Sequence, residues 1–200
     1  MSSLFLDTSY DQILGLLDEE KSWIESKTFE GQKLTGIIHS DLHAILSRNS
    51  ISPLDLKAVF YCAGPGFYTG LRVAYGIADI FRLHNIPILS FYSYLIPRLV
   101  GHVNYKWITK AYRGEVFVYD SSTDRIDLLL EKDLVNFQFE GDVFTHTPTS
   151  IDEKILALFP RVKFSQELLI KNPELIFGSV KSEEKIYYFR PLDEEYKPSL

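Results

Sequence analysis

A glycine-rich turn between an apolar run and a threonine–arginine pair is the stretch of this sequence best suited to chemistry. Residues 58–62 are apolar, and Gly64-Pro65-Gly66 follows them before Thr69 and Arg72. The apolar run predicts a buried strand, the turn predicts a sharp change of direction, and Thr69 predicts the cap of a helix. Backbone N–H groups at such a helix start point into one small space, where they can bind an anion.

A second polar turn stands near the N-terminus, where Asp7-Thr8-Ser9 follows the apolar residues 4–6. Such a turn can bind a phosphate or a metal-bound phosphate, and it can equally be an Asx or Ser/Thr turn that closes a hairpin. The two turns together give the candidate anion- or nucleotide-binding residues, which are Asp7, Thr8, Gly64, Gly66, Thr69 and Arg72.

No complete catalytic constellation accompanies these turns in the sequence. Cys62 is the only cysteine, has no histidine near it in the sequence, and fits a small buried hydrophobe. His39 and His43 are four residues apart and would share a helix face. Because no acidic residue stands at a helical offset to complete a metal site, we interpret them as an exposed or interface-facing pair. The sequence therefore predicts neither catalytic nor metal-binding residues.

The composition is that of an ordinary globular protein of 200 residues, with 46% apolar and 24% charged residues. The net charge of −6 argues against strong nucleic-acid binding by this chain alone, since phosphate contacts need clustered lysine and arginine. One cysteine favours a reducing compartment. No apolar run reaches the roughly 20 residues of a membrane span, and the first residues lack a signal-peptide pattern. We therefore expect a cytoplasmic protein that makes no membrane contact.

The pattern of apolar residues predicts an α/β chain in two regions, which we place at residues 1–100 and 101–200. The early strands predict an antiparallel meander, and strand–helix–strand around the glycine turn predicts parallel pairing. The second region is mostly β. Strands are expected at 4–6, 13–17, 22–29, 58–62, 86–90, 105–111, 115–119, 126–130, 143–145 and 186–189. Helices are expected at 37–47, 70–84, 91–100 (broken or begun near Pro97) and 152–159.

The stretch from residue 60 to 80 resembles the signature of the TsaB (YeaZ) family. Members typically carry Gly-Pro-Gly-Ser-Phe-Thr-Gly-Leu-Arg, and residues 64–72 read Gly-Pro-Gly-Phe-Tyr-Thr-Gly-Leu-Arg. Residues 6–9, 85–88 and 113–117 are similar to further family segments in the same order. The resemblance covers residues 4–118 well and the remainder thinly. The sequence departs from the family at Phe67-Tyr68, which replaces Ser-Phe, and in its short second half.

The resemblance implies an α/β fold of the actin/Hsp70/sugar-kinase (ASKHA) type, with two lobes of mixed β-sheets and a reduced second lobe. It also implies a non-catalytic subunit that pairs with the catalytic paralogue TsaD and the ATPase TsaE. That complex makes N6-threonylcarbamoyladenosine beside the anticodon of ANN-decoding tRNAs, so this chain would meet tRNA only through the complex. The paralogue's metal-binding histidines and adenosine loop have no match here. The resemblance therefore implies no cofactor on this chain alone, and ATP or ADP only at an interface of the complex.

The helix expected at residues 70–84 is apolar on two faces, which predicts that it is covered on two sides. One side faces the sheet, and the other faces either an internal layer or a partner. Family members pack this helix and the preceding one against the equivalent pair of a partner, a mode that also allows a homodimer. The resemblance thus assigns a partner interface to Leu42, Ile45, Leu46, Leu71, Ala74, Tyr75 and Ala78. On this reading, Ala74→Arg should abolish partner binding while the chain stays folded.

Two other functions stay open from the sequence. The first is an enzyme, either an ATP-dependent phosphotransferase or a glycoprotease-like protein, against which the missing adenosine loop and metal ligands argue. The second is a homodimeric scaffold with another partner, which the shortened second region allows.

Overall fold

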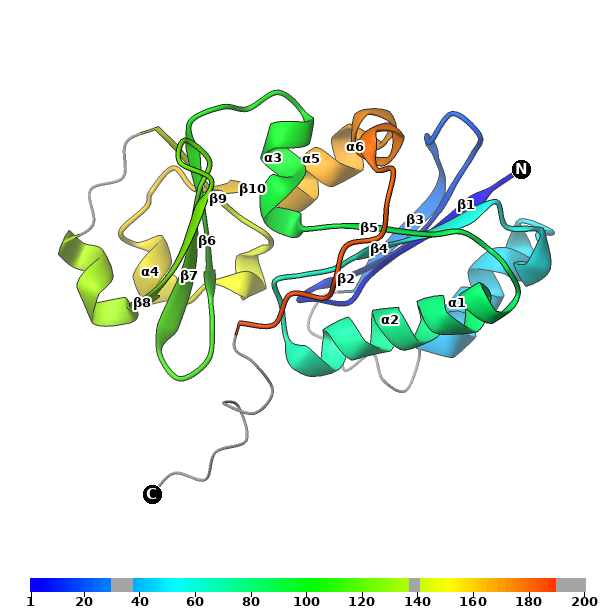
Figure 1. The fold of residues 1–200 in the computed structure, drawn as a ribbon, viewed down its shortest axis with the longest axis horizontal. Coiled ribbons are helices and arrows are strands. Elements are labelled where there is room, and N and C mark those ends of the chain that lie inside the picture. Colours follow the sequence, from blue (N-terminus) through cyan, green and yellow to red (C-terminus); the bar gives the residue numbers. More distant parts are fainter. Residues whose placement is uncertain (30–37, 137–140, 190–200) are drawn as a thin grey trace, which may run out of the picture.

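The computed structural model describes residues 1–29, 38–136 and 141–189, and these form two lobes that lie side by side (Figure 1). The first lobe holds a five-stranded sheet in the order β3-β2-β1-β4-β5. The antiparallel meander of β1 to β3 and the parallel pairing of β1, β4 and β5 match the sequence prediction. The strands are β1 (Ser3–Asp7), β2 (Gln12–Leu17), β3 (Trp23–Phe29), β4 (Ala58–Cys62) and β5 (Ile88–Phe91).

The second sheet repeats the topology of the first. Its order is β10-β9-β6-β7-β8, in which β6, β7 and β8 form an antiparallel meander. β9 pairs in parallel with β6, and β10 pairs in parallel with β9. Two sheets with the same order and the same strand directions are the architecture that the fold prediction required. The strands are β6 (Tyr105–Lys110), β7 (Glu115–Asp120), β8 (Arg125–Leu130), β9 (Asp142–Thr145) and β10 (Lys163–Phe164).

The lobes differ in their helices. In the first lobe α1 (Ile38–Arg48) and α2 (Tyr68–Leu83) lie together on one face of the sheet (Figure 1). α2 has 16 residues and connects β4 to β5. The corresponding connection from β9 to β10 carries the four-residue α4 (Glu153–Leu156), which is shorter than the helix expected at 152–159. The second lobe is therefore reduced, as the resemblance implied.

Strand alternation sends neighbouring side chains of the first sheet to two separate cores. Leu4 and Leu6 of β1 face the core beneath α1 and α2, whereas Phe5 faces the opposite core. That opposite core contains Leu169 and Phe177, which come from α5 (Ser165–Lys171) and α6 (Pro173–Ser179). The placement of all residues from 101 onward in the second lobe was wrong, because α5 and α6 return to the first sheet.

The helix expected at residues 91–100, broken or begun near Pro97, does begin beside that proline, and it is shorter than the expected range. β5 ends at Phe91, a single 3-10 turn spans Ser93–Leu95, and α3 spans only Ile96–Leu99. α3 contacts both α5 and α6, so these helices together cover the second face of the first sheet. Across the described part of the chain, no helix combines the length and apolar character that a membrane crossing requires.

The chain after α6 runs along β5, the edge strand of the first sheet (Figure 1). The Ser90 N–H donates to the Ser182 carbonyl over 3.1 Å, and the Glu184 N–H donates to the Ser90 hydroxyl over 2.7 Å. The Tyr187 N–H donates to the Ala63 carbonyl over 2.8 Å. Residues 186–189 do not form the expected strand. The tail nevertheless covers the edge of the sheet. Unpaired backbone N–H and C=O groups at an edge strand otherwise invite pairing with another chain.

Tyrosines buried in the second lobe predict a loss of stability at alkaline pH. The hydroxyl of Tyr105 is buried and donates to the Tyr94 carbonyl over 2.8 Å, and burial raises the pKa of Tyr105 to about 12. Burial also raises the pKa of Tyr94 and Tyr119.

A raised pKa means that the fold favours the neutral phenol of these tyrosines. The stabilisation is therefore complete below the unfolded pKa of about 10 and is lost as pH rises through the folded pKa. We expect the free energy of unfolding in urea to fall steeply between about pH 10 and 12. A flat profile over that range would contradict the prediction, and Tyr105→Phe should reduce the slope.

Candidate functional site

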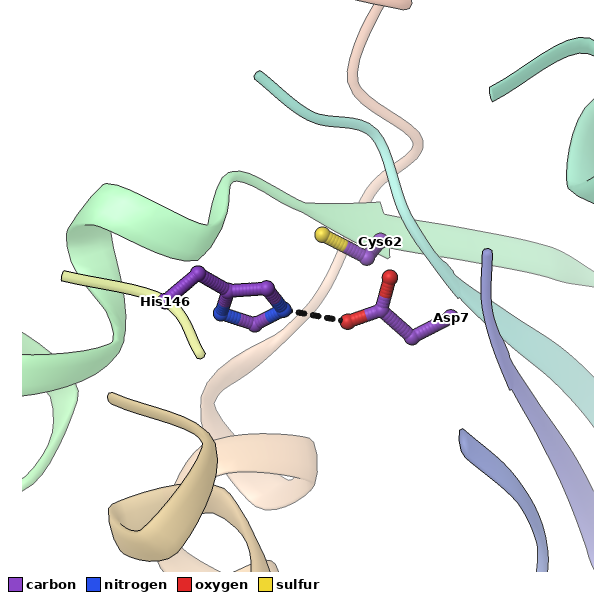
Figure 2. Close-up of side chains that lie close together, drawn as sticks. All are labelled: Asp7, Cys62 and His146. Atoms are coloured by element: carbon purple, nitrogen blue, oxygen red, sulfur yellow. Dashed lines mark hydrogen bonds and ion pairs between the residues drawn. The ribbon is translucent and has the colours of Figure 1, made fainter. Parts of the chain in front are cut away.

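Three strands of the two sheets end at the junction between the lobes, and each delivers one titratable side chain there. Asp7 is the last residue of β1, Cys62 is the last residue of β4, and His146 directly follows β9. The carboxyl ends of parallel strands are where α/β folds commonly place their sites. Figure 2 shows the three side chains converging. Their atoms that could bind a metal ion (one oxygen, one nitrogen and the sulfur) all lie within 4.8 Å of one another.

Asp7 and His146 form a fully buried pair across the lobe junction. Asp7 Oδ2 lies 2.6 Å from His146 Nε2, and both side chains are 0% exposed (Figure 2). Because an ionised carboxylate can only accept, Nε2 carries the shared proton. His146 Nδ1 lies 3.0 Å from the Ser165 hydroxyl, which also accepts from Trp107 Nε1 over 3.3 Å. The pair is thus the centre of a hydrogen-bonded chain that connects both sheets with α5.

The other oxygen of Asp7 is held by the turn that follows β1. Asp7 Oδ1 accepts from the Ser9 N–H over 2.9 Å and from the Ser9 hydroxyl over 2.6 Å. Burial works to raise the pKa of Asp7, but the interactions with His146 and Ser9 outweigh it and lower that pKa. Asp7 is therefore a carboxylate with both oxygens fixed.

Cys62 lies beside this pair as a protonated thiol. Burial first, and then the negative charge of Asp7, raise the pKa of Cys62 well above its ordinary value. A thiol with a raised pKa is a weak nucleophile, because the thiolate is the reactive form. The three residues resemble a Cys–His–Asp triad in type, but their burial and protonation do not fit nucleophilic catalysis.

The candidate anion-binding residues of the two turns come together, but they bind one another. The Thr8 hydroxyl donates to the Gly70 carbonyl over 2.5 Å, and the Phe67 N–H donates to the Ser9 carbonyl over 2.9 Å. A Cβ at Gly66 would lie 2.8 Å from that same Ser9 carbonyl oxygen. The signature glycines therefore allow the start of α2 to pack directly on the β1–β2 turn. The prediction of an open anion site at these residues is corrected, because chain atoms fill the space between the turns.

Two further members of the predicted anion site differ from the expectation. Thr69 is not the helix cap, since α2 begins at Tyr68 and its N-cap is Phe67, which makes no side-chain capping bond. Thr69 is exposed instead. Arg72 is also exposed and lies with its guanidinium carbon 4.7 Å from the centre of the Tyr68 ring.

The predicted partner interface is also corrected, because most of its residues lie in the core of the first lobe. These residues belong to α1 and α2, whose inner faces pack on the sheet. Leu42 is half-buried against the same core, and only Tyr75 is exposed, at 36%. The five residues with 0–3% exposure are Ile45, Leu46, Leu71, Ala74 and Ala78. Side chains that are buried between their own helix and the sheet of the same lobe cannot contact a partner protein.

A small aromatic cavity opens beside the start of α2. Its volume is about 90 Å³, and it lies between the first lobe, the β6–β7 hairpin and the tail. Three cations stand at its rings: Arg72 near Tyr68, Lys110 at 5.7 Å from the Phe67 ring, and Arg113 at 4.9 Å from the Tyr112 ring. The lining residues are Gly66, Phe67, Tyr68, Ala111, Tyr112, Tyr188 and Phe189. Phe67 and Tyr68, which depart from the family signature, thus form part of a surface pocket.

Sequence reasoning missed His146 and Ser165. His146 is 139 positions from Asp7 along the chain, and no local pattern connects the two. One signal was available, because a polar run follows the strand expected at 143–145, and parallel strands deliver the residues after them to one edge. His39 and His43 are exposed on α1, and within the described ranges Asp7, Cys62 and His146 form the one group suited to a metal ion.

Removing the negative charge of Asp7 from the buried pair should lower the stability of the protein. We expect Asp7→Asn to lower the free energy of unfolding at pH 7 by about 2 kcal/mol, because hydrogen bonds to a charged group contribute about 1.5–3 kcal/mol. Urea unfolding measures the change, with the exposed Asp55→Asn as the control that should change little. If the two variants are equally stable, the pair contributes nothing to the junction.

Comparison with known proteins gives likenesses to solved structures. No family model and no curated protein matches the chain. An uncharacterised protein with similarity to peptidase YeaZ, from Pseudomonas aeruginosa, superposes with a TM-score of 0.63 at 16% identity, over 94% of this chain and 99% of that one. YeaZ from Pseudomonas aeruginosa gives 0.61 at 17% identity, over 95% and 99%. The ethanolamine utilization protein EutJ from Carboxydothermus hydrogenoformans gives 0.50 at 12% identity, over 88% and 89%.

These likenesses confirm the fold class. At such identities they show shared architecture, and the whole-length match means that both lobes and their connections take part. The chain therefore has a YeaZ-like fold with two lobes of mixed sheets, as the signature at residues 64–72 implied.

Proposed function

We propose that this chain is a non-catalytic subunit of the TsaB (YeaZ) type. It pairs with a TsaD-like paralogue and works with a TsaE-like ATPase in the threonylcarbamoylation of the adenosine next to the anticodon of ANN-decoding tRNAs. The support is the YeaZ-like fold over 95% of the chain together with the signature at residues 64–72. The proposal places the protein in the cytoplasm and its contact with tRNA within the complex.

The observation that carries the proposal is the outward face of α2. Ile80 is 52% exposed and Leu83 is 83% exposed, although both are large apolar side chains. Val73 and Gly76 continue the same stripe toward the start of the helix. Gly76 is exposed, and Val73 is half-buried and also packs against the core of the first lobe. The spacing 73, 76, 80, 83 alternates three and four residues, which is the a/d pattern of helices that pack against other helices.

This stripe suits close packing with another helix. A Cβ built at Gly76 meets no atom within 4 Å, so a partner backbone can approach there. Asp79 and Arg82 pair beside the stripe and give it a polar border. The proposed interface therefore lies on the exposed face of α2, opposite the buried face that the sequence suggested. A second copy of the chain could use the same face, which keeps a homodimer as the alternative assembly.

A charge in this stripe should prevent pairing without harming the fold. We expect Ile80→Asp to weaken binding to the TsaD-like paralogue at least about tenfold, because central apolar anchors contribute 2 kcal/mol or more to interfaces. Co-purification and titration calorimetry measure the loss. Leu175→Asp is the matched control, since Leu175 is 55% exposed on α6, against the other face of the sheet. Equal binding by both variants would place the interface elsewhere.

An enzymatic function is the second candidate, because a protein with this fold is described as similar to a peptidase. The buried state of Asp7 and the raised pKa of Cys62 argue against it. ATPase or peptidase activity of the isolated chain that disappears in Asp7→Ala, with the variant still folded, would favour the enzyme.

ATP or ADP at an interface of the complex is also part of the proposal. The aromatic cavity beside α2 is the place we assign to it, since rings can stack on a base and Arg72, Lys110 and Arg113 supply positive charge for phosphates. Nucleotide binding by the assembled complex that is unchanged in Phe67→Ala would remove this assignment.

A further inference from the structure

Asp7, Cys62 and His146 supply the three side-chain types that zinc binds most often in proteins. They come from separate strands, two in the first lobe and one in the second, and their ligand atoms meet within 4.8 Å (Figure 2). All three are 0–1% exposed. We propose that Asp7, Cys62 and His146 bind a Zn²⁺ ion that joins the two lobes. This goes beyond the proposed function, because it is a property of the chain without any partner.

The distances are close to those of a zinc site. Zinc lies about 2.0–2.3 Å from oxygen, nitrogen and sulfur ligands, so tetrahedral ligand atoms stand roughly 3.2–3.8 Å apart. Asp7 Oδ2 and His146 Nε2 are 2.6 Å apart, and all the ligand atoms lie within 4.8 Å. In the bound state the carboxylate and imidazole atoms must therefore stand at least about 0.6 Å farther apart.

The residues around the three ligands are arranged as an outer shell for a metal. Ser9 fixes Asp7 Oδ1 with its N–H and hydroxyl, which leaves Oδ2 directed at His146. Ser165 lies 3.0 Å from His146 Nδ1, on the far side of the ring. A ligating histidine usually donates its second N–H to such a partner, which fixes the ring and its tautomer. The Ser165 oxygen has two lone pairs, enough for Nδ1–H and the Trp107 N–H.

Charge and protons balance in the bound state. Zn²⁺ with one carboxylate, one thiolate and a neutral imidazole has no net charge, which suits a site cut off from water. The Cys62 proton leaves to solvent as the Zn–S bond forms. The imidazole proton moves from Nε2 to Nδ1, the Nδ1–H then donates a hydrogen bond to the Ser165 oxygen, and Nε2 becomes the ligand atom. An oxygen ligand in the fourth position would complete the tetrahedron.

The single cysteine of the chain makes a sharp test, because a thiolate–metal band can come only from Cys62. The full chain is unfolded in denaturant with a chelator, refolded with Co²⁺ alone, and freed of excess metal. We expect one Co²⁺ per chain, a thiolate-to-cobalt charge-transfer band in the near ultraviolet, and the visible bands of tetrahedral cobalt. Zn²⁺ should displace the Co²⁺ and remove these bands.

Variants separate this site from surface binding. Cys62→Ser should lose the charge-transfer band, and His146→Gln should lose at least about tenfold in metal affinity, since ligand-shell changes cost that much or more. The double variant His39→Gln/His43→Gln should keep the full spectrum, because both histidines are exposed on α1. Circular dichroism checks that each variant is folded. A folded wild-type chain without the band, or metal content that is unchanged in Cys62→Ser and His146→Gln, would overturn the proposal.

Discussion

Ala74→Arg is expected to destabilise the protein strongly. Ala74 is 0% exposed and packs in the core between α2 and the first sheet. An arginine there must bury an unpaired guanidinium and add several methylenes to a filled space, and we expect a loss of about 4 kcal/mol or more. Since domains of this size are stable by about 5–15 kcal/mol, this loss removes much of the total. Urea unfolding and circular dichroism at room temperature measure it.

The matched control for this substitution lies on the same helix. Gly76 is exposed, and a Cβ built on it meets no atom within 4 Å. Gly76→Arg should therefore leave the fold intact, and it can add up to about 1 kcal/mol because glycine is a poor helix former. The same variant should block the proposed partner surface. If Ala74→Arg folds as well as Gly76→Arg, the inner and outer faces of α2 have been assigned the wrong way round.

Gly70→Ala is the second substitution with a large expected effect. A Cβ at Gly70 would overlap the Thr8 carbonyl oxygen, which is backbone and cannot rotate away. The start of α2 must then move off the β1–β2 turn, which breaks the Thr8–Gly70 bond of 2.5 Å and the Phe67–Ser9 bond of 2.9 Å. With about 1 kcal/mol for each hydrogen bond and a similar amount for lost packing, we expect a cost of about 3 kcal/mol.

Thermal and urea unfolding of Gly70→Ala should be compared with Gly76→Ala. Both replace a glycine of α2, but only Gly70 faces a backbone atom, so Gly76→Ala should be neutral or stabilising. Equal stability of the two variants would show that the close approach of the two turns is not needed.

The first lobe could be predicted from the sequence because its strands are short apolar runs with clear breaks between them. The meander and the strand–helix–strand unit follow from order and spacing alone. The face of α2 could not be predicted in this way. Apolar periodicity shows that a helix has two apolar sides. Which side packs on the sheet depends on how closely the side chains of each face fit against the strands. Ala74 and Ala78 are small and both 0% exposed, and they allow α2 to lie close to the sheet.

The second half was less predictable for two physical reasons. α5 and α6 are short helices on either side of Asn172, so neither shows enough turns for a clear helical period. Their apolar side chains pack on the first sheet, a contact between distant parts of the chain. His146 is hidden in the same way, since only the repeated sheet topology brings it to Asp7. Local patterns therefore predicted the two meanders and α2, whereas α5, α6 and the junction depend on long-range packing.

The most direct test of the proposed function is reconstitution of threonylcarbamoyl transfer. The TsaD-like and TsaE-like proteins of the same genome are incubated with ANN-decoding tRNA, ATP and the threonylcarbamoyl donor, and the modified nucleoside is measured by mass spectrometry. We predict modification when this chain is added, a strong loss with Ile80→Asp, and full modification with Leu175→Asp. Modification that proceeds equally well without this chain would contradict its role as a subunit of the complex.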